Sequence, residues 1–262
     1  MFKIIFPLDI GQRYYSIHYT YLLNILRYLN CDITFKENLD IDNTSFRCLI
    51  NNKSFIFDFA DSNEYRKLGD DPIFKFHTKK EDLDKVIPFP PVSFYNWEEF
   101  YELEKDIKYN ACGYVTSRQR PYAGAAERRF KVQALLKRCY RDVQTELLEQ
   151  VDYWREISKT GVSVFVPGQN NNIYDRGHAQ YLAFGCATIS PYLPEILPFN
   201  REIVENYHYV KCLDDYTDFP ALIDDVLVKP DYLKQVGENA KKLFRETSTP
   251  GAIGNWINLC LK

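Results

Sequence analysis

The chain has 262 residues, of which 45% are hydrophobic and 16% aromatic, and its net charge at pH 7 is −3. This length suffices for one large domain or for two domains of about 100 to 150 residues each, and the composition excludes a disordered chain. Because no basic excess exists to hold a nucleic-acid backbone, we expect no nucleic-acid partner.

Short apolar runs and helical patterns alternate in the first part of the chain. Two apolar runs flank Asn51, Asn52 and Lys53, a pattern typical of two strands joined by a turn. Residues 87–94, IPFPPVSF, contain too much proline for a central strand. The patterns predict strands at residues 2–6, 45–50, 54–59 and 73–76, and helices at residues 17–29 and 96–106.

The second part of the chain alternates more regularly. Strands are predicted at residues 108–116, 162–166, 186–190 and 207–212, and helices at residues 124–140, 143–158, 176–184, 216–228 and 232–247. Strands that alternate with helices favour parallel sheets covered on both faces, so the predicted fold class is α/β.

The proline-rich stretch at 87–94 is the best candidate for a domain boundary. We expect an N-terminal domain at residues 1–98 and a C-terminal domain at residues 99–248. The last segment, residues 249–262, restarts after Pro250 and Gly251 with an apolar helical face, and we expect it to pack back toward the N-terminal domain.

Cysteine usage and the N-terminus bear on the cellular compartment. The 7 cysteines form no C-x-x-C pair and are odd in number, a pattern typical of reduced thiols. The start of the chain becomes polar after Leu8, unlike a signal peptide, and no apolar run approaches the roughly 18 residues of a membrane span. We therefore expect a soluble, cytoplasmic protein for which association with a membrane surface stays open.

Polar and cationic residues follow two of the predicted strands. SRQRPYAGAAERR follows the strand at 108–116, and PGQNNNIYDR follows the strand at 162–166. Open parallel sheets bind ligands at the carboxyl ends of their strands, and arginines there can hold a diphosphate. Arg176 stands at a predicted helix start, where a cation opposes the helix dipole and a bound anion would explain it. The alternative is a solvated loop of turn-forming residues.

A longer block resembles a known family. VDYWREISKTGVSVFVPGQNNNIYDRGHAQYLAFGCATISPYLPEILP resembles the C-terminal domain of GT-B glycosyltransferases, among them the spore-maturation-type enzymes and the protein O-glucosyltransferase and capsule xylosyltransferase family. The likeness covers residues 108–249. It implies two Rossmann-like domains with a cleft between them, a nucleotide-sugar donor on the C-terminal domain, an acceptor on the N-terminal domain, and no cofactor or essential metal.

The resemblance also implies donor-binding residues. Arg176 falls near the arginine of the donor diphosphate, and Ser117 and Arg128 resemble the serine and arginine that flank the phosphate loop. Gln180 stands where many retaining relatives carry a glutamate, and the absence of that glutamate favours an inverting enzyme. His208 belongs to an HY pair, which a structural role at the end of a strand would also explain. The expected donor-binding residues are Ser117, Arg118, Arg128, Asn171, Arg176, Gln180 and His208.

An inverting transferase needs a base near the acceptor hydroxyl, and in GT-B enzymes the N-terminal domain usually supplies it. Asp61 follows the strand at 54–59 and is the leading candidate, before Asp9 and His18. Each aspartate has the alternative role of a helix N-cap. Residues 70–80, DDPIFKFHTKK, read either as a sugar acceptor platform or as an edge strand protected by lysines. The four histidines lie far apart in the sequence and no D-x-D motif follows an apolar strand, so no metal site is expected.

The sequence thus predicts a glycosyltransferase that moves a sugar from a nucleotide-sugar to a hydroxyl of a glycan, lipid-linked or protein acceptor, with inversion. The alternative is a nucleotide-binding module of GT-B type without turnover.

Overall fold

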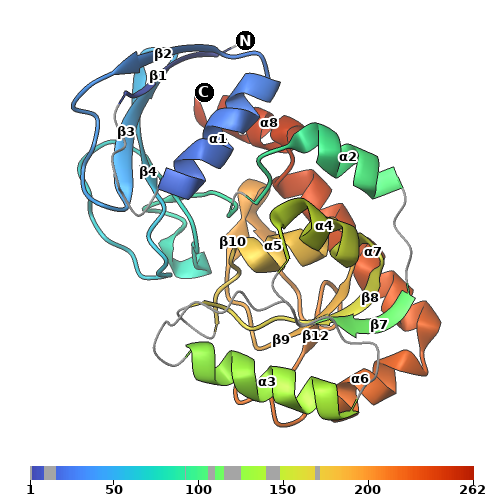
Figure 1. The fold of residues 1–262 in the computed structure, drawn as a ribbon. Coiled ribbons are helices and arrows are strands. Elements are labelled where there is room, and N and C mark those ends of the chain that lie inside the picture. Colours follow the sequence, from blue (N-terminus) through green and yellow to red (C-terminus); the bar gives the residue numbers. More distant parts are fainter. Residues whose placement is uncertain are drawn as a thin grey trace. The chain divides into compact units, whose positions relative to one another are not determined.

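A computed structural model describes residues 2–8, 16–91, 93–105, 110–114, 125–139, 148–168 and 172–262. The chain divides into two compact units, coloured along the sequence in Figure 1. Unit 1 comprises Met1–Trp97, Glu195–Glu202 and Glu246–Lys262, and unit 2 comprises Glu98–Pro194 and Ile203–Arg245. The chain therefore returns to unit 1 twice after entering unit 2.

Unit 1 is built on a six-stranded sheet in the order β2-β1-β3-β4-β5-β6. The β1–β2, β4–β5 and β5–β6 pairs are parallel, whereas β3 is antiparallel to both β1 and β4. The strands are β1 (Lys3–Pro7), β2 (Asp32–Lys36), β3 (Ser45–Ile50), β4 (Lys53–Asp58), β5 (Ile73–Lys75) and β6 (Ile87–Pro88).

The expectation of parallel sheets is wrong for this unit, because β3 and β4 form a hairpin. Asn51 and Asn52 both adopt positive φ, at 49° and 67°, which is the backbone of a tight two-residue hairpin turn. The chain therefore reverses at once and has no room for a helical crossover between the two strands. The predicted pair of strands around this turn is confirmed.

Aromatic side chains on one face of the sheet form the core of unit 1. Phe46, Phe57 and Phe74 stand opposite one another on β3, β4 and β5, and their successive ring centroids are 5.6 and 5.0 Å apart. Helices α1 (Ser16–Tyr28) and α8 (Pro250–Cys260) both belong to this unit. A Cβ added at Gly254 of α8 would lie 3.1 Å from the Leu29 side chain just after α1, so the two helices approach closely.

The segment Glu195–Glu202 adds a small antiparallel pair to unit 1. It contains β10 (Ile196–Leu197), the 3-10 helix η2 (Pro198–Asn200) and β11 (Arg201–Glu202). Phe199 packs on Trp256 of α8 with ring centroids 5.0 Å apart, and Trp256 Nε1 donates to Pro88 O at 2.8 Å. Another 3-10 helix, η1 (Lys80–Asp82), precedes β6.

Unit 2 contains a four-stranded sheet in the order β12-β9-β8-β7, in which all neighbouring strands are parallel. The strands are β7 (Asn110–Tyr114), β8 (Thr160–Val164), β9 (Ala187–Ser190) and β12 (Val210–Lys211), and the helices are α2 (Trp97–Lys105, beginning at the last residue of unit 1), α3 (Ala125–Cys139), α4 (Gln150–Ser158), α5 (Arg176–Ala183), α6 (Phe219–Leu227) and α7 (Pro230–Thr247, whose last two residues belong to unit 1).

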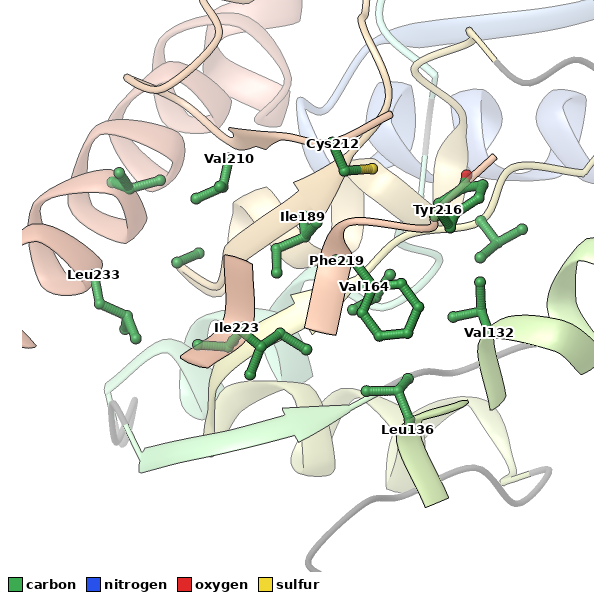
Figure 2. Packing of buried hydrophobic residues seen from close by; sticks show 14 residues of the cluster. Val132, Leu136, Val164, Ile189, Val210, Cys212, Tyr216, Phe219, Ile223 and Leu233 are labelled. Atoms are coloured by element: carbon green, nitrogen blue, oxygen red, sulfur yellow. The ribbon is translucent and has the colours of Figure 1, made fainter. Parts of the chain in front are cut away.

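Both faces of this sheet are covered. On one face, Val164 and Ile189 pack with Leu136 of α3, Ile223 of α6 and Leu233 of α7, all fully or nearly fully buried (Figure 2). On the other face, Phe165 stacks on His178 of α5 with ring centroids 4.6 Å apart. Unit 2 is thus a three-layer α/β unit, as the alternating pattern of strands and helices predicts.

In its described residues the protein is therefore of the α/β class, with a mixed six-stranded sheet, a parallel four-stranded sheet and the small antiparallel pair of β10 and β11. None of the helices in the described part of the chain is both long and apolar enough to span a bilayer. The GT-B arrangement of two domains with a cleft stays a prediction.

Candidate functional site

The carboxyl ends of β1, β4 and β5 lie at the same edge of the unit 1 sheet, because these strands run in the same direction. Asp58 is the last residue of β4 and Lys75 the last residue of β5, and the two stand opposite each other in the parallel pairing. Their relative exposures are 0% and 1%. Two oppositely charged side chains therefore lie buried at this edge.

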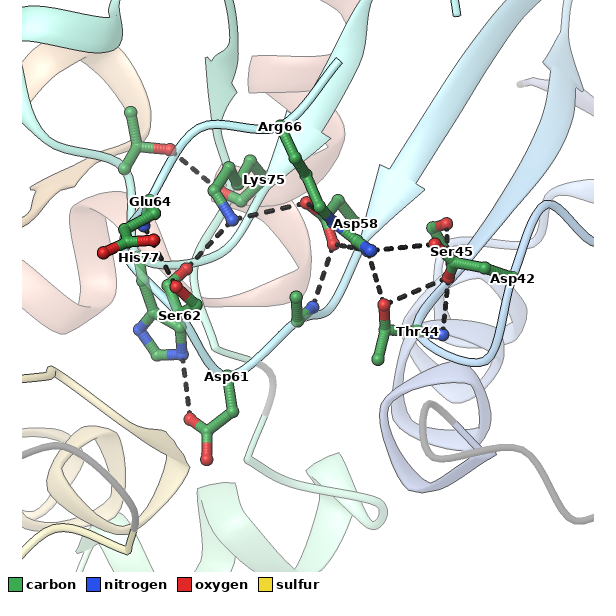
Figure 3. A network of polar contacts seen from close by, with 12 residues as sticks. Asp42, Thr44, Ser45, Asp58, Asp61, Ser62, Glu64, Arg66, Lys75 and His77 are labelled. Atoms are coloured by element: carbon green, nitrogen blue, oxygen red, sulfur yellow. Dashed lines mark hydrogen bonds and ion pairs between the residues drawn. The ribbon is translucent and has the colours of Figure 1, made fainter. Parts of the chain in front are cut away.

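A network of ion pairs surrounds Asp58 (Figure 3). Lys75 Nζ lies 3.3 Å from Asp58 Oδ2 and donates to Ser62 O at 2.9 Å. Arg66 donates to both carboxylate oxygens of Asp58, at 2.6 and 3.1 Å, and to Asp42 Oδ2 at 2.8 Å. Both oxygens of Asp58 thus accept from a cation, and the network fastens the loop that carries Arg66 to the strand ends.

The charges of this network shift the pKa values of its members. Burial alone raises the pKa of the Asp58 carboxyl, but the hydrogen bonds from Arg66 and the positive charge of Lys75 outweigh burial and hold this pKa below its usual range. Burial lowers the pKa of Lys75, against the attraction of Asp58. Asp58 is therefore a fixed anion with a structural role, since a carboxylate held by two cations is a poor proton acceptor.

Three residues further along the chain, Asp61 meets a different partner. His77 Nε2 lies 3.4 Å from Asp61 Oδ1, and His77 Nδ1 lies 3.9 Å from Glu195 Oε1 (Asp61 and His77 are labelled in Figure 3). The side chains of Asp61, His77 and Glu195 are 27%, 4% and 1% exposed. One imidazole thus lies between two carboxylates, and of these three groups Asp61 is the most accessible.

Backbone pairing fixes this arrangement. His77 has a positive φ of 55°, a conformation that residues other than glycine adopt at a cost. Thr78 Oγ1 donates to Lys75 O at 3.0 Å, and Ile196 N donates to Thr78 O at 2.7 Å. Because residues 195 and 196 pair with the chain directly after His77, Glu195 is held beside the ring although it is distant in sequence.

Of the other two candidates for the base, His18 and Asp9, only His18 lies among the described residues. The ring of His18, in the first turn of α1, lies 5.5 Å from the ring of Phe59 and 5.0 Å from that of Phe76, so it packs on the aromatic face of the sheet. Asp9 lies outside the described residues. Asp61 thus lies beside an ionisable side chain, His77, which sequence reasoning missed.

In unit 2 the cationic residues of α3 reach the end of β8. Arg129 Nε donates to Val166 O at 3.3 Å, and a Cβ added at Gly168 would lie 3.9 Å from Arg129 Nη2. Burial raises the pKa of Tyr216, and the positive charge of nearby Arg128 opposes that rise. Tyr216 Oη itself donates to Phe165 O at 3.1 Å. Two arginines therefore stand where the carboxyl end of β8 turns into the next loop.

The start of α5 already holds a carboxylate. Asp175 is its N-cap and accepts from Gly177 N at 2.6 Å and His178 N at 3.2 Å, while Gly168 N donates to its other oxygen at 3.4 Å. Arg176 is the first residue of this helix. The negative charge of Asp175 therefore offsets the helix dipole beside Arg176, which is a second explanation for a cation at this position.

Gln180 and His208 are buried among protein partners. Gln150 Nε2 donates to Gln180 Oε1 at 3.2 Å. His208 Nδ1 accepts from Val204 N at 2.9 Å, and the hydroxyl of Tyr209 accepts from Leu193 N at 3.2 Å. These contacts are the ones that a structural role of the HY pair requires. Ser117, Arg118 and Asn171 lie outside the described residues.

Sequence reasoning also missed His178. Its side chain is 0% exposed and lies between the rings of Phe165, Tyr174 and Tyr209, at centroid distances of 4.6, 5.3 and 6.2 Å. Neither ring nitrogen has a hydrogen-bond partner among the described residues. Burial lowers the pKa of this imidazole to about 3, so it is neutral near pH 7.

No group of three or more histidine, cysteine or acidic side chains in the described ranges is placed to hold a metal ion. No protein-family model matches the chain, and no curated protein matches it. The residues at the carboxyl ends of the strands, in the sheet of unit 1 and in the sheet of unit 2, are therefore the basis for a functional proposal.

Proposed function

We propose that the protein is a glycosyltransferase that moves a sugar from a nucleotide-sugar to an acceptor hydroxyl, with inversion at the anomeric carbon. The observation that carries this proposal is the contact between Arg129 and Val166 O at the carboxyl end of β8, with Arg128 beside it on α3. In open parallel sheets this edge is where nucleotides bind, and guanidinium groups suit the paired oxygens of a diphosphate.

Unit 1 supports the catalytic half of the proposal. A direct displacement needs a base for the acceptor hydroxyl, and Asp61 is a partly exposed carboxylate at a strand edge. In the transfer step the hydroxyl gives its proton to Asp61 while its oxygen bonds to the anomeric carbon. The bond from that carbon to the diphosphate breaks, and the diphosphate leaves with the electron pair, a charge that guanidinium groups stabilise.

The second candidate function is a nucleotide-binding module without turnover. The observation that favours it is Gln180, which stands where the resemblance places the glutamate of retaining relatives and whose side-chain oxygen accepts from Gln150 Nε2. In this case the arginines bind a nucleotide, and Asp61 does not act as a catalytic base.

The first test is binding. The protein is screened by thermal shift and calorimetry against UDP, GDP, CMP, ADP and TDP and their sugars, then compared with Arg128→Ala and Arg129→Ala. Arg155→Ala is the matched control, because Arg155 is an arginine of the same unit that pairs with Asp152 and Glu99 on the surface. We expect one nucleotide to stabilise the wild type and the control, by about 2.7 kcal/mol at a hundredfold excess over Kd, and to lose affinity in both α3 variants.

The second test is transfer. With the donor identified, release of the nucleotide and appearance of labelled product are measured for wild type and for Asp61→Asn. Loss of transfer with donor affinity kept supports the enzyme, and binding without transfer in the wild type supports the module. If none of the nucleotides binds, both functions are wrong.

A further inference from the structure

We infer that His77 and Glu195 are positioning residues that form, together with Asp61, a three-group proton relay in unit 1. The inference rests on the proposed function, because it gives the base Asp61 a partner that takes up, and later returns, the proton removed from the acceptor hydroxyl. It assigns a role to two residues for which the sequence offers no motif.

The exposure of the three side chains gives the relay its direction. The exposed fraction falls from 27% at Asp61 to 4% at His77 and 1% at Glu195. An acceptor hydroxyl can therefore reach Asp61 and cannot reach the ring. A buried carboxylate such as Glu195 is costly unless a positive or hydrogen-bonding group faces it, and His77 Nδ1 is the ring atom on that side, at 3.9 Å.

The groups around Asp61 and Asp58 differ, and this difference explains why the relay is placed at Asp61 and not at Asp58. Asp58 faces Lys75 and Arg66, two cations that keep their protons and hold both of its oxygens. Asp61 instead faces the imidazole of His77, a ring whose two nitrogens can each carry a proton. The ring of His77 lies against the carboxylates of Asp61 and Glu195 and the ring of Phe76, while Lys75, two residues earlier on β5, is turned to Asp58.

The backbone conformation of His77 is typical of a functional position. Its left-handed conformation is unfavourable for a residue with a side chain, and such strain gathers at functional positions. The pairing of Lys79 with Glu195 and the hydrogen bond from Ile196 to Thr78 hold the chain in this conformation. The same backbone pairing thus fixes the ring and delivers the second carboxylate.

One proton moves from the acceptor hydroxyl through Asp61 to His77 and later back through Asp61. The relay requires the proton of the resting ring to be on Nδ1, on the side of Glu195, so that Nε2 can accept the proton from Asp61. Nδ1 has no hydrogen-bond partner among the described residues, so its separation of 3.9 Å from Glu195 Oε1 must shorten in the relay. The proton from the acceptor hydroxyl goes to Asp61 and then to Nε2, which leaves Asp61 ionised and an imidazolium between two carboxylates. After the nucleotide diphosphate has left, the proton returns through Asp61 to water. The distance of 3.4 Å between Nε2 and Asp61 Oδ1 must shorten for this transfer, as acid–base contacts often do when substrate binds.

A spectroscopic experiment tests the relay without any activity. The ring nitrogens of the 4 histidines are observed by 15N–1H correlation near pH 7, and His77→Gln assigns the His77 signals. We expect Nδ1 to carry the proton in wild type, and Glu195→Gln to change the signal of that nitrogen. Glu202→Gln is the matched control, because Glu202 lies on the same returning segment but pairs with Lys80 on the surface. Equal His77 spectra in wild type and Glu195→Gln would overturn the relay.

Transfer kinetics then separate the relay from the proposed function. We expect kcat to fall about 10²- to 10⁴-fold in Asp61→Asn, and less in His77→Gln and Glu195→Gln, with the KM for donor unchanged. In Glu195→Gln the acid limb of the pH–rate profile should also move, which a purely structural loss would not cause, and melting curves check that each variant is folded. If wild type transfers no sugar, the proposed function fails, while the ring spectra still show whether Glu195 affects the protonation of the His77 ring. If both relay variants transfer at the wild-type rate and pH profile, the relay fails while the function stands.

Discussion

Asp58 and Lys75 stand opposite each other at the ends of β4 and β5, with Lys75 Nζ 3.3 Å from Asp58 Oδ2 and their side chains 0% and 2% exposed. The pair is joined by Arg66, which reaches from Asp58 to Asp42. A buried pair of this kind stabilises a fold weakly compared with an apolar pair, but loss of one partner leaves an uncompensated charge. The pair therefore specifies how the Arg66 loop closes over the sheet.

Asp58→Asn should destabilise the protein by about 3 to 5 kcal/mol, because Lys75 and Arg66 keep their charges while losing their anion. Urea unfolding followed by far-ultraviolet circular dichroism measures this loss. Asp70→Asn is the control, since Asp70 pairs with Lys67 on the surface and its side chain is 96% exposed. The double variant Asp58→Asn with Lys75→Met should regain part of the loss. Equal unfolding midpoints for Asp58→Asn and Asp70→Asn would contradict this account of the network.

His178 should make the protein less stable in mild acid. Burial lowers the pKa of its imidazole from 6.5 to about 3, so below pH 6.5 the unfolded chain takes up a proton that the folded protein does not. The contribution of His178 is thus complete above pH 6.5 and is lost progressively as the pH falls toward 3, with a limiting slope of about 1.4 kcal/mol per pH unit.

The measurement is the free energy of unfolding at pH 7 and at pH 4.5 for wild type and for His178→Phe, in which a ring without a titratable nitrogen fills the same aromatic site. Carboxylates such as Asp58 also weaken the fold in acid, but they are present in both proteins and cancel in the difference. We expect the variant to lose less stability than wild type between the two pH values. An identical loss in both would mean that the ring is charged in the folded protein.

The helices and strands of unit 2 could be predicted because their apolar residues repeat at the spacing of buried strands and amphipathic helices. The predicted helix at 176–184 and strand at 186–190 match α5 and β9 to within a residue. The predicted strand at 207–212 is longer than β12, because Asn206 and His208 form a turn that takes up its first half. Strand β2 was missed although Ile33 and Phe35 alternate with polar residues, because it is a short and largely exposed edge strand.

Asp61 could be named from the sequence because an aspartate after an apolar strand falls at a sheet edge. Its partners could not be named. His77 reaches Asp61 through the parallel pairing of β4 and β5, and Glu195 arrives on a segment that returns to unit 1 from the other end of the chain. Such contacts depend on strand order and on the return of a distant segment, and local periodicity carries neither.

The turn between β3 and β4 offers a stabilising change. Asn52 has a φ of 67°, and glycine is the preferred residue at the second position of a two-residue hairpin turn of this kind. Asn52→Gly should therefore stabilise the protein by about 0.5 kcal/mol, and Asn52→Val should destabilise it by about 1 kcal/mol or more, since a β-branched residue tolerates positive φ poorly. Thermal unfolding of both variants checks the order. A higher melting temperature for the valine variant would contradict the turn geometry.

The N-cap of α5 separates the structural role of Asp175 from its effect on a bound anion. Asparagine caps helices as well as aspartate, so Asp175→Asn should keep most of the stability, whereas Asp175→Ala should lose about 1 kcal/mol. If the edge beside Arg129 and Arg176 binds a diphosphate, removal of the Asp175 charge also removes a repulsion of about 1 kcal/mol, and Asp175→Asn should bind the nucleotide roughly 5-fold more tightly. Calorimetry at low and high salt tests this, because the gain should shrink as salt screens the charge. Unchanged affinity in Asp175→Asn at low salt would mean that the nucleotide phosphates lie away from the start of α5.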